Sequence, residues 1–137
     1  AQRLLRTLCR HCKRERELDG QAIRHYGLAR FLKEGQRSVY QAEGCEHCLD
    51  TGYAGRIAIH ELFVLDEDMH RVIMSGADAT VLHAAARRQG MITLYEDGLR
   101  KVVAGSTSLE EVMRVTQDQT ESADQVEAAA ALASPAV

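Results

Sequence analysis

The chain contains no tryptophan and few aromatic residues of any kind: four tyrosines and two phenylalanines among 137 residues. It has a single proline. A hydrophobic core must therefore be built mainly from Leu, Ile, Val, Ala and Met. Hydrophobic residues make up 45% of the chain, which is enough for one domain with a modest core.

Long apolar stretches are also missing. No run approaches the roughly 20 residues that a membrane-spanning helix needs, and residues 1–6 lack the apolar segment of a signal peptide. We therefore expect a cytosolic protein without direct membrane insertion. Because the chain does not begin with Met, we expect it to be part of a longer protein.

Catalytic motifs are the third absence. The chain contains no G-x-x-x-x-G-K-[ST] phosphate-binding loop, no G-x-S-x-G and no H-E-x-x-H. The acidic pairs at 96–97 and 110–111 stand where helix N-termini are predicted, so we interpret them as caps and not as acid–base catalysts. The sequence thus predicts no catalytic residue and no nucleotide-binding residue in this chain.

Charge is unevenly distributed. Residues 1–37 hold ten Lys/Arg and four Asp/Glu, a net of +6, and residues 38–137 hold seven and sixteen, a net of −9, which gives the total of −3. The basic front part allows contact with nucleic acid or an acidic partner. The acidic remainder argues against a protein that binds nucleic acid along its whole length.

Four cysteines form two C-x-x-C pairs, Cys9/Cys12 and Cys45/Cys48. Each short turn aims two sulfurs at one point, and two such turns supply the four thiolates of a tetrahedral Zn²⁺ site. Four protein ligands leave no position for water, so the predicted zinc is structural. The alternative is a pair of redox-active dithiols or disulfides, which a cytosolic location disfavours.

The two histidines inside the pairs, His11 and His47, have the chemistry to replace a sulfur. Because four cysteines already complete the site, we expect them, with Arg10 and Lys13, to offset the excess negative charge of a Zn(Cys)₄ centre. The other histidines show no metal-ligand spacing, and we interpret them as structural; they are His25, His60, His70 and His83.

The pattern of the remaining residues predicts an α+β fold with short elements. We expect a helix near 21–33, a strand at 56–65, and then successive short helices that end near Gly76, Gly90, Gly105 and Thr116. Their predicted N-caps are Asp66, Asp78, Thr93 and Ser108, and the last two have the spacing of a capping box with Glu96 and Glu111. Residues 118–137 are rich in Ala and acids, and we predict a disordered or weakly helical tail.

Six segments together resemble the type II secretion ATPases, and the related type IV pilus assembly ATPases share much of the pattern. These segments are 2–9, 44–48, 51–56, 59–62, 97–102 and 107–116, the last reading TSLEEVMRVT. The first cysteine pair departs from the family in carrying Arg10 where a proline is frequent. Arg56 and Arg114 match family positions, but the sequence assigns them no role.

The resemblance implies a hexameric, RecA-like ATPase on the cytoplasmic face of the bacterial inner membrane. ATP hydrolysis, with Mg²⁺, would drive pseudopilus or pilus assembly, and the partners would be neighbouring subunits and inner-membrane platform proteins. Residues 1–8 would end the ATPase core, 9–65 would form a Cys₄ zinc subdomain, and 66–117 a C-terminal helical bundle. The catalytic motifs of the family lie outside this chain, so no catalytic residue is transferred.

Two other functions fit parts of the sequence. A zinc-ribbon nucleic-acid-binding module would use the zinc site and the basic residues of 1–37, although the chain lacks the clustered aromatic residues that stack on bases. A free zinc scaffold or adaptor would differ from the first reading only in having no ATPase core attached.

Overall fold

The computed structural model describes residues 1–116, and the predicted tail at 118–137 lies outside the described residues. Within them, short strands and short helices make up the α+β fold that the sequence predicts. The strands are β1 (Gln2–Leu8), β2 (Arg14–Glu17), β3 (Ser38–Gln41) and β4 (Tyr53–His60). The helices are α1 (Gly20–His25), α2 (Glu67–Met74), α3 (Ala79–Arg88), α4 (Leu94–Val103) and a last helix at 109–116. No helix among the described residues is long and apolar enough to cross a membrane.

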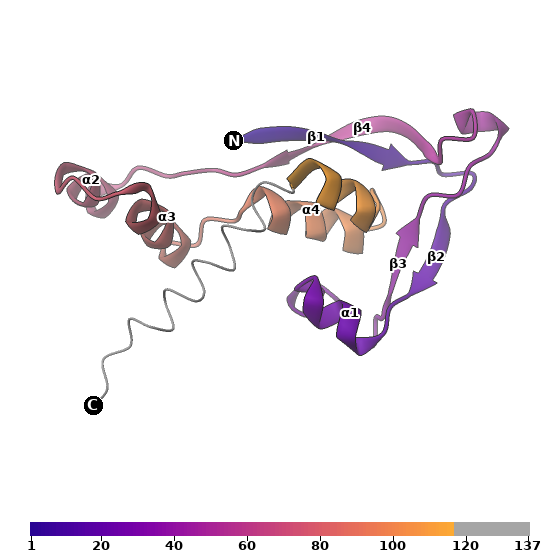
Figure 1. Cartoon of the computed structure of the whole chain (residues 1–137), viewed down its shortest axis with the longest axis horizontal. Helices are drawn as coiled ribbons and strands as arrows, with labels where there is room; N and C mark the ends of the chain where they lie inside the picture. The colour runs from indigo at the N-terminus through magenta and orange to yellow at the C-terminus, as the bar shows by residue number, and fades with distance from the viewer. Residues whose placement is uncertain (117–137) are drawn as a thin grey trace.

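The strands form two separate antiparallel ribbons (Figure 1). In the first, β1 pairs with β4 from Gln2–His60 to Leu8–Tyr53, and the register shifts between Arg6 and Leu8. In the second, β2 pairs with β3 and places Arg14 opposite Gln41. Since each ribbon has only two strands, neither is stable without packing against other elements.

That packing comes from one main hydrophobic cluster. Its members lie on both ribbons, on α4 and on the last helix, and several come from the connection between the cysteine pairs. They are Leu5, Leu18, Leu28, Val39, Ile59, Leu94, Leu99, Val102, Leu109 and Val112. Because the connection contributes to this cluster, residues 13–44 are packed into the main core instead of forming an isolated loop.

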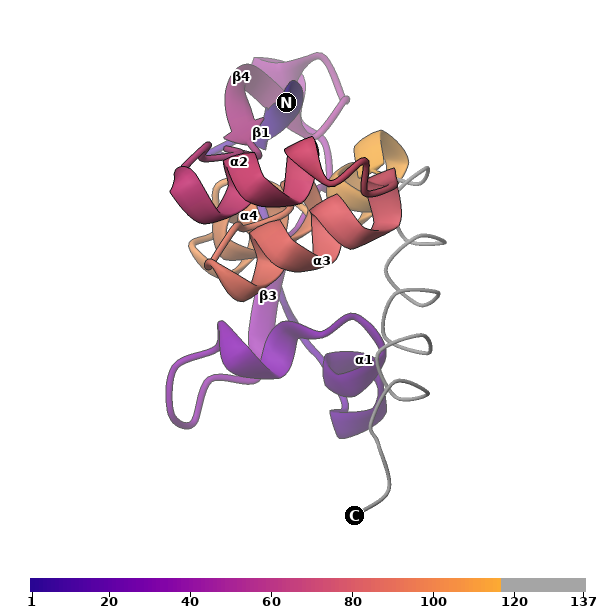
Figure 2. The ribbon, with the colours of Figure 1, turned by 90° about the vertical axis from the view of Figure 1, so that its left-hand side faces the viewer.

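Helices α2 and α3 have a small cluster of their own, made by Met69, Ala85 and Ala86. They lie side by side at one end of the molecule, away from the two-ribbon junction (Figures 1 and 2). The helices predicted at 66–117 are thus divided between two clusters. The predicted domain boundaries themselves stay a prediction.

The helix caps confirm most of the predicted boundaries. The side chains of Asp66, Asp78 and Thr93 accept hydrogen bonds from backbone N–H groups in the first turns of α2, α3 and α4. Glu96 completes the capping box at Thr93. The prediction for Ser108 is half correct, because its hydroxyl accepts from the Glu111 N–H while the Glu111 carboxylate binds elsewhere.

Two predicted elements are wrong in extent. The helix expected at 21–33 ends at His25, because Gly27 adopts the left-handed conformation at φ 67°, and only a short 3-10 turn at Leu28–Arg30 follows. The strand expected at 56–65 begins at Tyr53 and ends at His60, where its partner β1 also ends. Residues 62–65 continue beyond the ribbon, and no strand within residues 1–116 pairs with them.

Candidate metal centre

The four cysteines lie where the two ribbons meet. Cys9 follows β1 and Cys12 precedes β2, while Cys45 follows β3 and Cys48 precedes β4. The backbone N–H of Cys9 donates to the carbonyl of Gly52 at 2.9 Å, which ties the first turn to the second. Each ribbon therefore contributes one strand end to each cysteine pair.

The structure brings all four predicted ligands together, with their sulfurs within 4.8 Å of one another. The Cys9–Cys45 pair is separated by 3.9 Å, and the Cys12–Cys48 and Cys45–Cys48 pairs by 3.8 Å. A tetrahedron with Zn–S bonds of about 2.3 Å has sulfurs about 3.8 Å apart, whereas a disulfide needs about 2.05 Å. The spacing of this donor set fits a tetrahedral metal ion and does not fit two disulfides.

A short 3-10 turn, Glu46–Cys48, follows Cys45, and backbone N–H groups in and beside this second turn point at sulfur. Cys45 N–H and Gly52 N–H both donate to Cys48 Sγ at 3.2 Å, and Gly44 N–H donates to Cys12 Sγ at 3.4 Å. Such donors stabilise thiolates, which are the form that binds metal.

Two glycines permit this close approach. Gly44 has φ 125°, and a Cβ there would lie 2.8 Å from the carbonyl oxygen of Asp50. Gly52 has φ 76°, and its Cβ would lie 2.6 Å from the Cβ of Ala42. Any side chain at either position would push the second turn away from its neighbours.

The sulfurs differ in acidity before any metal binds. Burial acts to raise the pKa of Cys48, but the N–H groups of Cys45 and Gly52 outweigh it and lower that pKa to about 6. Burial raises the pKa of Cys12 to about 12, against the opposing effect of the Gly44 N–H. A bound cation would deprotonate the coordinating thiols outright.

The predicted charge-compensating residues take different positions. The rings of His11 and His47 stack with centroids 4.1 Å apart, and neither belongs to the group of clustered ligand atoms. Lys13 Nζ lies 4.4 Å from the centre of the Tyr40 ring and donates to the carbonyl of Gly105 at 2.9 Å. Lys13 therefore also anchors the β2–β3 ribbon to the end of α4.

A buried carboxylate that sequence reasoning interpreted only as a cap is the centre of an ionic cluster. Glu111, 1% exposed, accepts from the guanidinium and the backbone N–H of Arg6 and from the guanidinium of Arg114, at 2.7–3.1 Å. Burial raises its pKa, but these donors prevail and lower it from 4.5 to about 2. The motif TSLEEVMRVT was the sequence signal; the role of Arg114, which the sequence left open, is to hold this carboxylate.

A second buried glutamate, Glu96, connects the other parts of the fold. It forms ion pairs with Arg30, from the connection between the cysteine pairs, and with Arg87 of α3, whose Nη2 lies 2.6 Å away. Burial opposes ionisation, but Arg87, the Thr93 N–H and Arg30 hold the pKa of Glu96 below its ordinary value. One carboxylate thus links the metal-site connection, α3 and α4.

Comparison with known proteins identifies the family. The family model of the type II/IV secretion system protein matches residues 1–114. The chain belongs to this family. The sequence-based resemblance to type II secretion and type IV pilus assembly ATPases is therefore confirmed.

Individual relatives of this family agree. The chain is 47% identical over 116 residues to a type IV pilus assembly ATPase, PilB, of Thermus thermophilus. This alignment covers 85% of this chain and 13% of the relative. It is 44% identical to the type II secretion system protein HxcR of Pseudomonas aeruginosa, over 86% of this chain and 21% of the relative. It is 41% identical to the type II secretion system ATPase E of Vibrio cholerae, over 86% of this chain and 23% of the relative. The chain therefore spans less than a quarter of the length of these relatives.

Proposed function

We propose that this chain is the zinc-binding, C-terminal part of a secretion ATPase and that it serves a structural role in that motor. The observation that carries the proposal is the four-sulfur cluster, with separations of 3.8–3.9 Å, inside a chain whose residues 1–114 match the family. Zinc is the favoured ion because four thiolates in a tetrahedron suit it. With all four positions taken by Cys9, Cys12, Cys45 and Cys48, the ion would hold the ribbons together and would not activate water.

The same family membership supports a proposal for the parent protein, the longer ATPase of which this chain would be one part. We propose that the parent hydrolyses ATP with Mg²⁺ and thereby powers pseudopilus assembly and type II protein export. It would act as a homohexamer on the cytoplasmic face of the inner membrane and contact inner-membrane platform proteins. The nucleotide site would belong to the parent and not to this chain, whose residues 1–8 would end the ATPase core.

The nucleic-acid-binding alternative is weakened by how the basic residues are used. Four arginines of residues 1–37 form ion pairs with glutamates: Arg6, Arg14, Arg16 and Arg30. Since each pair consumes positive charge that phosphates would need, the surface offers less electrostatic attraction than the net of +6 suggests. A salt-dependent shift of short duplexes in a gel would be the contrary result.

The first test is the metal content of the purified chain by mass spectrometry, with titration of free thiols. We expect close to one zinc per chain, lost in the Cys45→Ser/Cys48→Ser variant and kept in His47→Ala, which alters the same turn without removing a sulfur. Calorimetry with ATP should show no micromolar binding. Absence of zinc together with oxidised cysteines would contradict the metal site, and ATP binding would contradict the structural role.

A further inference from the structure

The segment between β4 and α2 exposes four large apolar side chains in succession. Leu62, Phe63, Val64 and Leu65, which we name the apolar strap, are 73%, 44%, 61% and 59% exposed. Consecutive side chains of extended chain point in opposite directions, so the strap is apolar on both faces. An extended segment with this pattern is typical of chain that is covered from both sides.

Among residues 1–116, the backbone of the strap also has no hydrogen-bond partner. The ribbon ends with mutual hydrogen bonds between Ala1 and Glu61, 2.6 and 2.8 Å long. Beyond this point, among the described residues, the strap donates and accepts no backbone hydrogen bond. On the ribbon itself, Leu4 lies opposite Ala58 and is 51% exposed, although the polar pair Gln2 and His60 lies between it and the strap.

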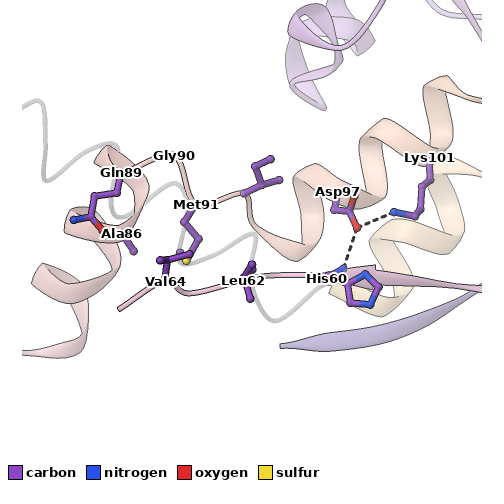
Figure 3. A pocket seen from close by; sticks show the side chains of 10 residues that line it. His60, Leu62, Val64, Ala86, Gln89, Gly90, Met91, Asp97 and Lys101 are labelled. Carbon is purple, nitrogen blue, oxygen red and sulfur yellow. Dashed lines mark hydrogen bonds and ion pairs between the residues drawn. The ribbon is translucent and has the colours of Figure 1, made fainter. Parts of the chain in front are cut away.

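A hollow of about 400 Å³ borders one side of the strap. Leu62 and Val64 line it together with Ala86 and Met91 from the end of α3 and the loop after it (Figure 3). At its polar end, Asp97 accepts from the backbone N–H of His60 and from Lys101, at 2.9 and 2.8 Å. Because these polar groups are satisfied within the chain, the hollow is suited to apolar side chains and not to a charged ligand.

We propose that the apolar strap is an intramolecular docking surface, covered in the parent protein by the ATP-hydrolysing part of the same polypeptide. This inference rests on the proposed function, which joins such a part to the chain ahead of Ala1. The position of Ala1, where the ATP-hydrolysing part would join this chain, favours that part over a second copy of the chain as the occupant. Ala1 is hydrogen-bonded to Glu61, the residue before the strap, so an upstream domain would reach the strap without a linker. The relatives, of which this chain spans 13–23%, have ample chain to cover it.

The test compares amide hydrogen exchange of residues 62–65 in the 137-residue chain and in the full-length parent, each in a monomeric fraction defined by light scattering. We expect rapid exchange in the 137-residue chain, since its strap amides have no acceptor among the described residues, and at least tenfold slower exchange in the monomeric parent. Equal rates in the two proteins would overturn the proposal. Protection that appears only in oligomers would assign the surface to a second copy, and a coding sequence without an ATPase part would remove the occupant.

A variant pair gives an independent readout. Leu62→Ser/Val64→Ser replaces two exposed side chains, so we expect the unfolding midpoint of the 137-residue chain to change little. In the full-length parent the same change should lower the midpoint by several degrees, because buried apolar contacts are lost. Val81→Ser, an exposed apolar position on α3, is the matched control and should be neutral in both proteins. A neutral result for the double variant in the parent would contradict the proposal.

The outcome is separable from that of the proposed function. Zinc content and ATP hydrolysis are measured on the same parent samples, and neither quantity decides whether the strap is protected. A parent that binds zinc and hydrolyses ATP but leaves the strap unprotected would refute only the docking surface. A parent without zinc but with a protected strap would refute only the metal site.

Discussion

At the scale of single residues, Glu111 is a buried carboxylate whose arginine partners lower its pKa to about 2. It is the acceptor for two arginines that come from opposite ends of the described chain, Arg6 and Arg114. Arg6 also lies over the ring of Tyr53, 4.1 Å from its centre, and the Tyr53 hydroxyl is 2.7 Å from that of Ser108. The carboxylate therefore fixes β1 against the last helix.

We predict that Glu111→Gln destabilises the chain by about 2 kcal/mol at pH 7, because charge-assisted hydrogen bonds are lost in a buried site. The folded-state pKa of about 2 lies below the ordinary 4.5. The stabilisation is thus fully present above pH 4.5 and is lost as pH falls toward 2. Urea denaturation from pH 7 to pH 3.5 should show the difference between wild type and variant shrinking at the acid end.

The neighbouring glutamate is the control for this prediction. Glu110 is exposed and pairs with Arg16 at 3.3 Å, so Glu110→Gln should leave the free energy of unfolding nearly unchanged. A Glu110→Gln variant as unstable as Glu111→Gln, or a Glu111→Gln deficit that stays constant down to pH 3.5, would show that the buried cluster is not the source of the effect.

At the scale of elements, α4 and the last helix approach closely at Gly98. A Cβ on Gly98 would lie 2.6 Å from Cγ1 of Val112, which is fully buried and whose β-branched side chain cannot turn away freely. We predict that Gly98→Ala destabilises the fold by roughly 1–3 kcal/mol despite the better helix propensity of alanine. Denaturation of Gly98→Ala, Val112→Ala and the double variant forms a thermodynamic cycle.

The double variant should recover at least about 1 kcal/mol relative to the sum of the single changes, because alanine at position 112 makes room for the added methyl. Additive effects would mean that the two helices do not meet as described. The same cycle on the exposed α3 residue Val81 with Gly98→Ala should be additive, since Val81 belongs to neither hydrophobic cluster and lies on a different helix.

Some local structure of these elements could be predicted from the sequence, and some could not. Asp66, Asp78 and Thr93 were predicted correctly because a cap is a local arrangement of a side chain and the next three N–H groups. Strands β1, β2 and β3 were missed, because β2 is entirely exposed and charged and each strand depends on a partner many residues away. Glu111 was interpreted as a cap for the same reason: its partner Arg6 is 105 residues distant.

The candidate metal site, in contrast to the strands, could be predicted from the sequence. Two C-x-x-C turns are local and chemically distinctive, so the clustering of four sulfurs could be predicted before the 32 intervening residues were placed. The end of the strand expected at 56–65 could not be predicted, because residues 62–65, the strap, are as apolar as a buried strand. Its side chains are 44–73% exposed, because the described residues cover them only in part.

At the scale of the whole molecule, the candidate metal site and the main core are connected. The connection between the cysteine pairs contributes Leu18, Leu28 and Val39 to the core, and Lys13 and Arg30 bind the end of α4 and Glu96. Without a metal, four thiols with no bond between them would lie at the junction of the two ribbons. Each ribbon has only two strands and could not stabilise the junction alone. A metal ion at this junction would therefore stabilise the entire fold and not only the turns that bind it.

We predict that a zinc chelator unfolds the chain in one cooperative transition instead of loosening the cysteine turns alone. Circular dichroism at 222 nm should then lose helix signal from α4 and from α2–α3 together. The pair α2–α3 cannot persist by itself, because helices of 8 and 10 residues with three buried side chains are too short to be stable in water. The unfolding midpoint should return when zinc is restored. A chelated chain that keeps its helix signal and melts at the same temperature would mean that apolar packing alone maintains the fold.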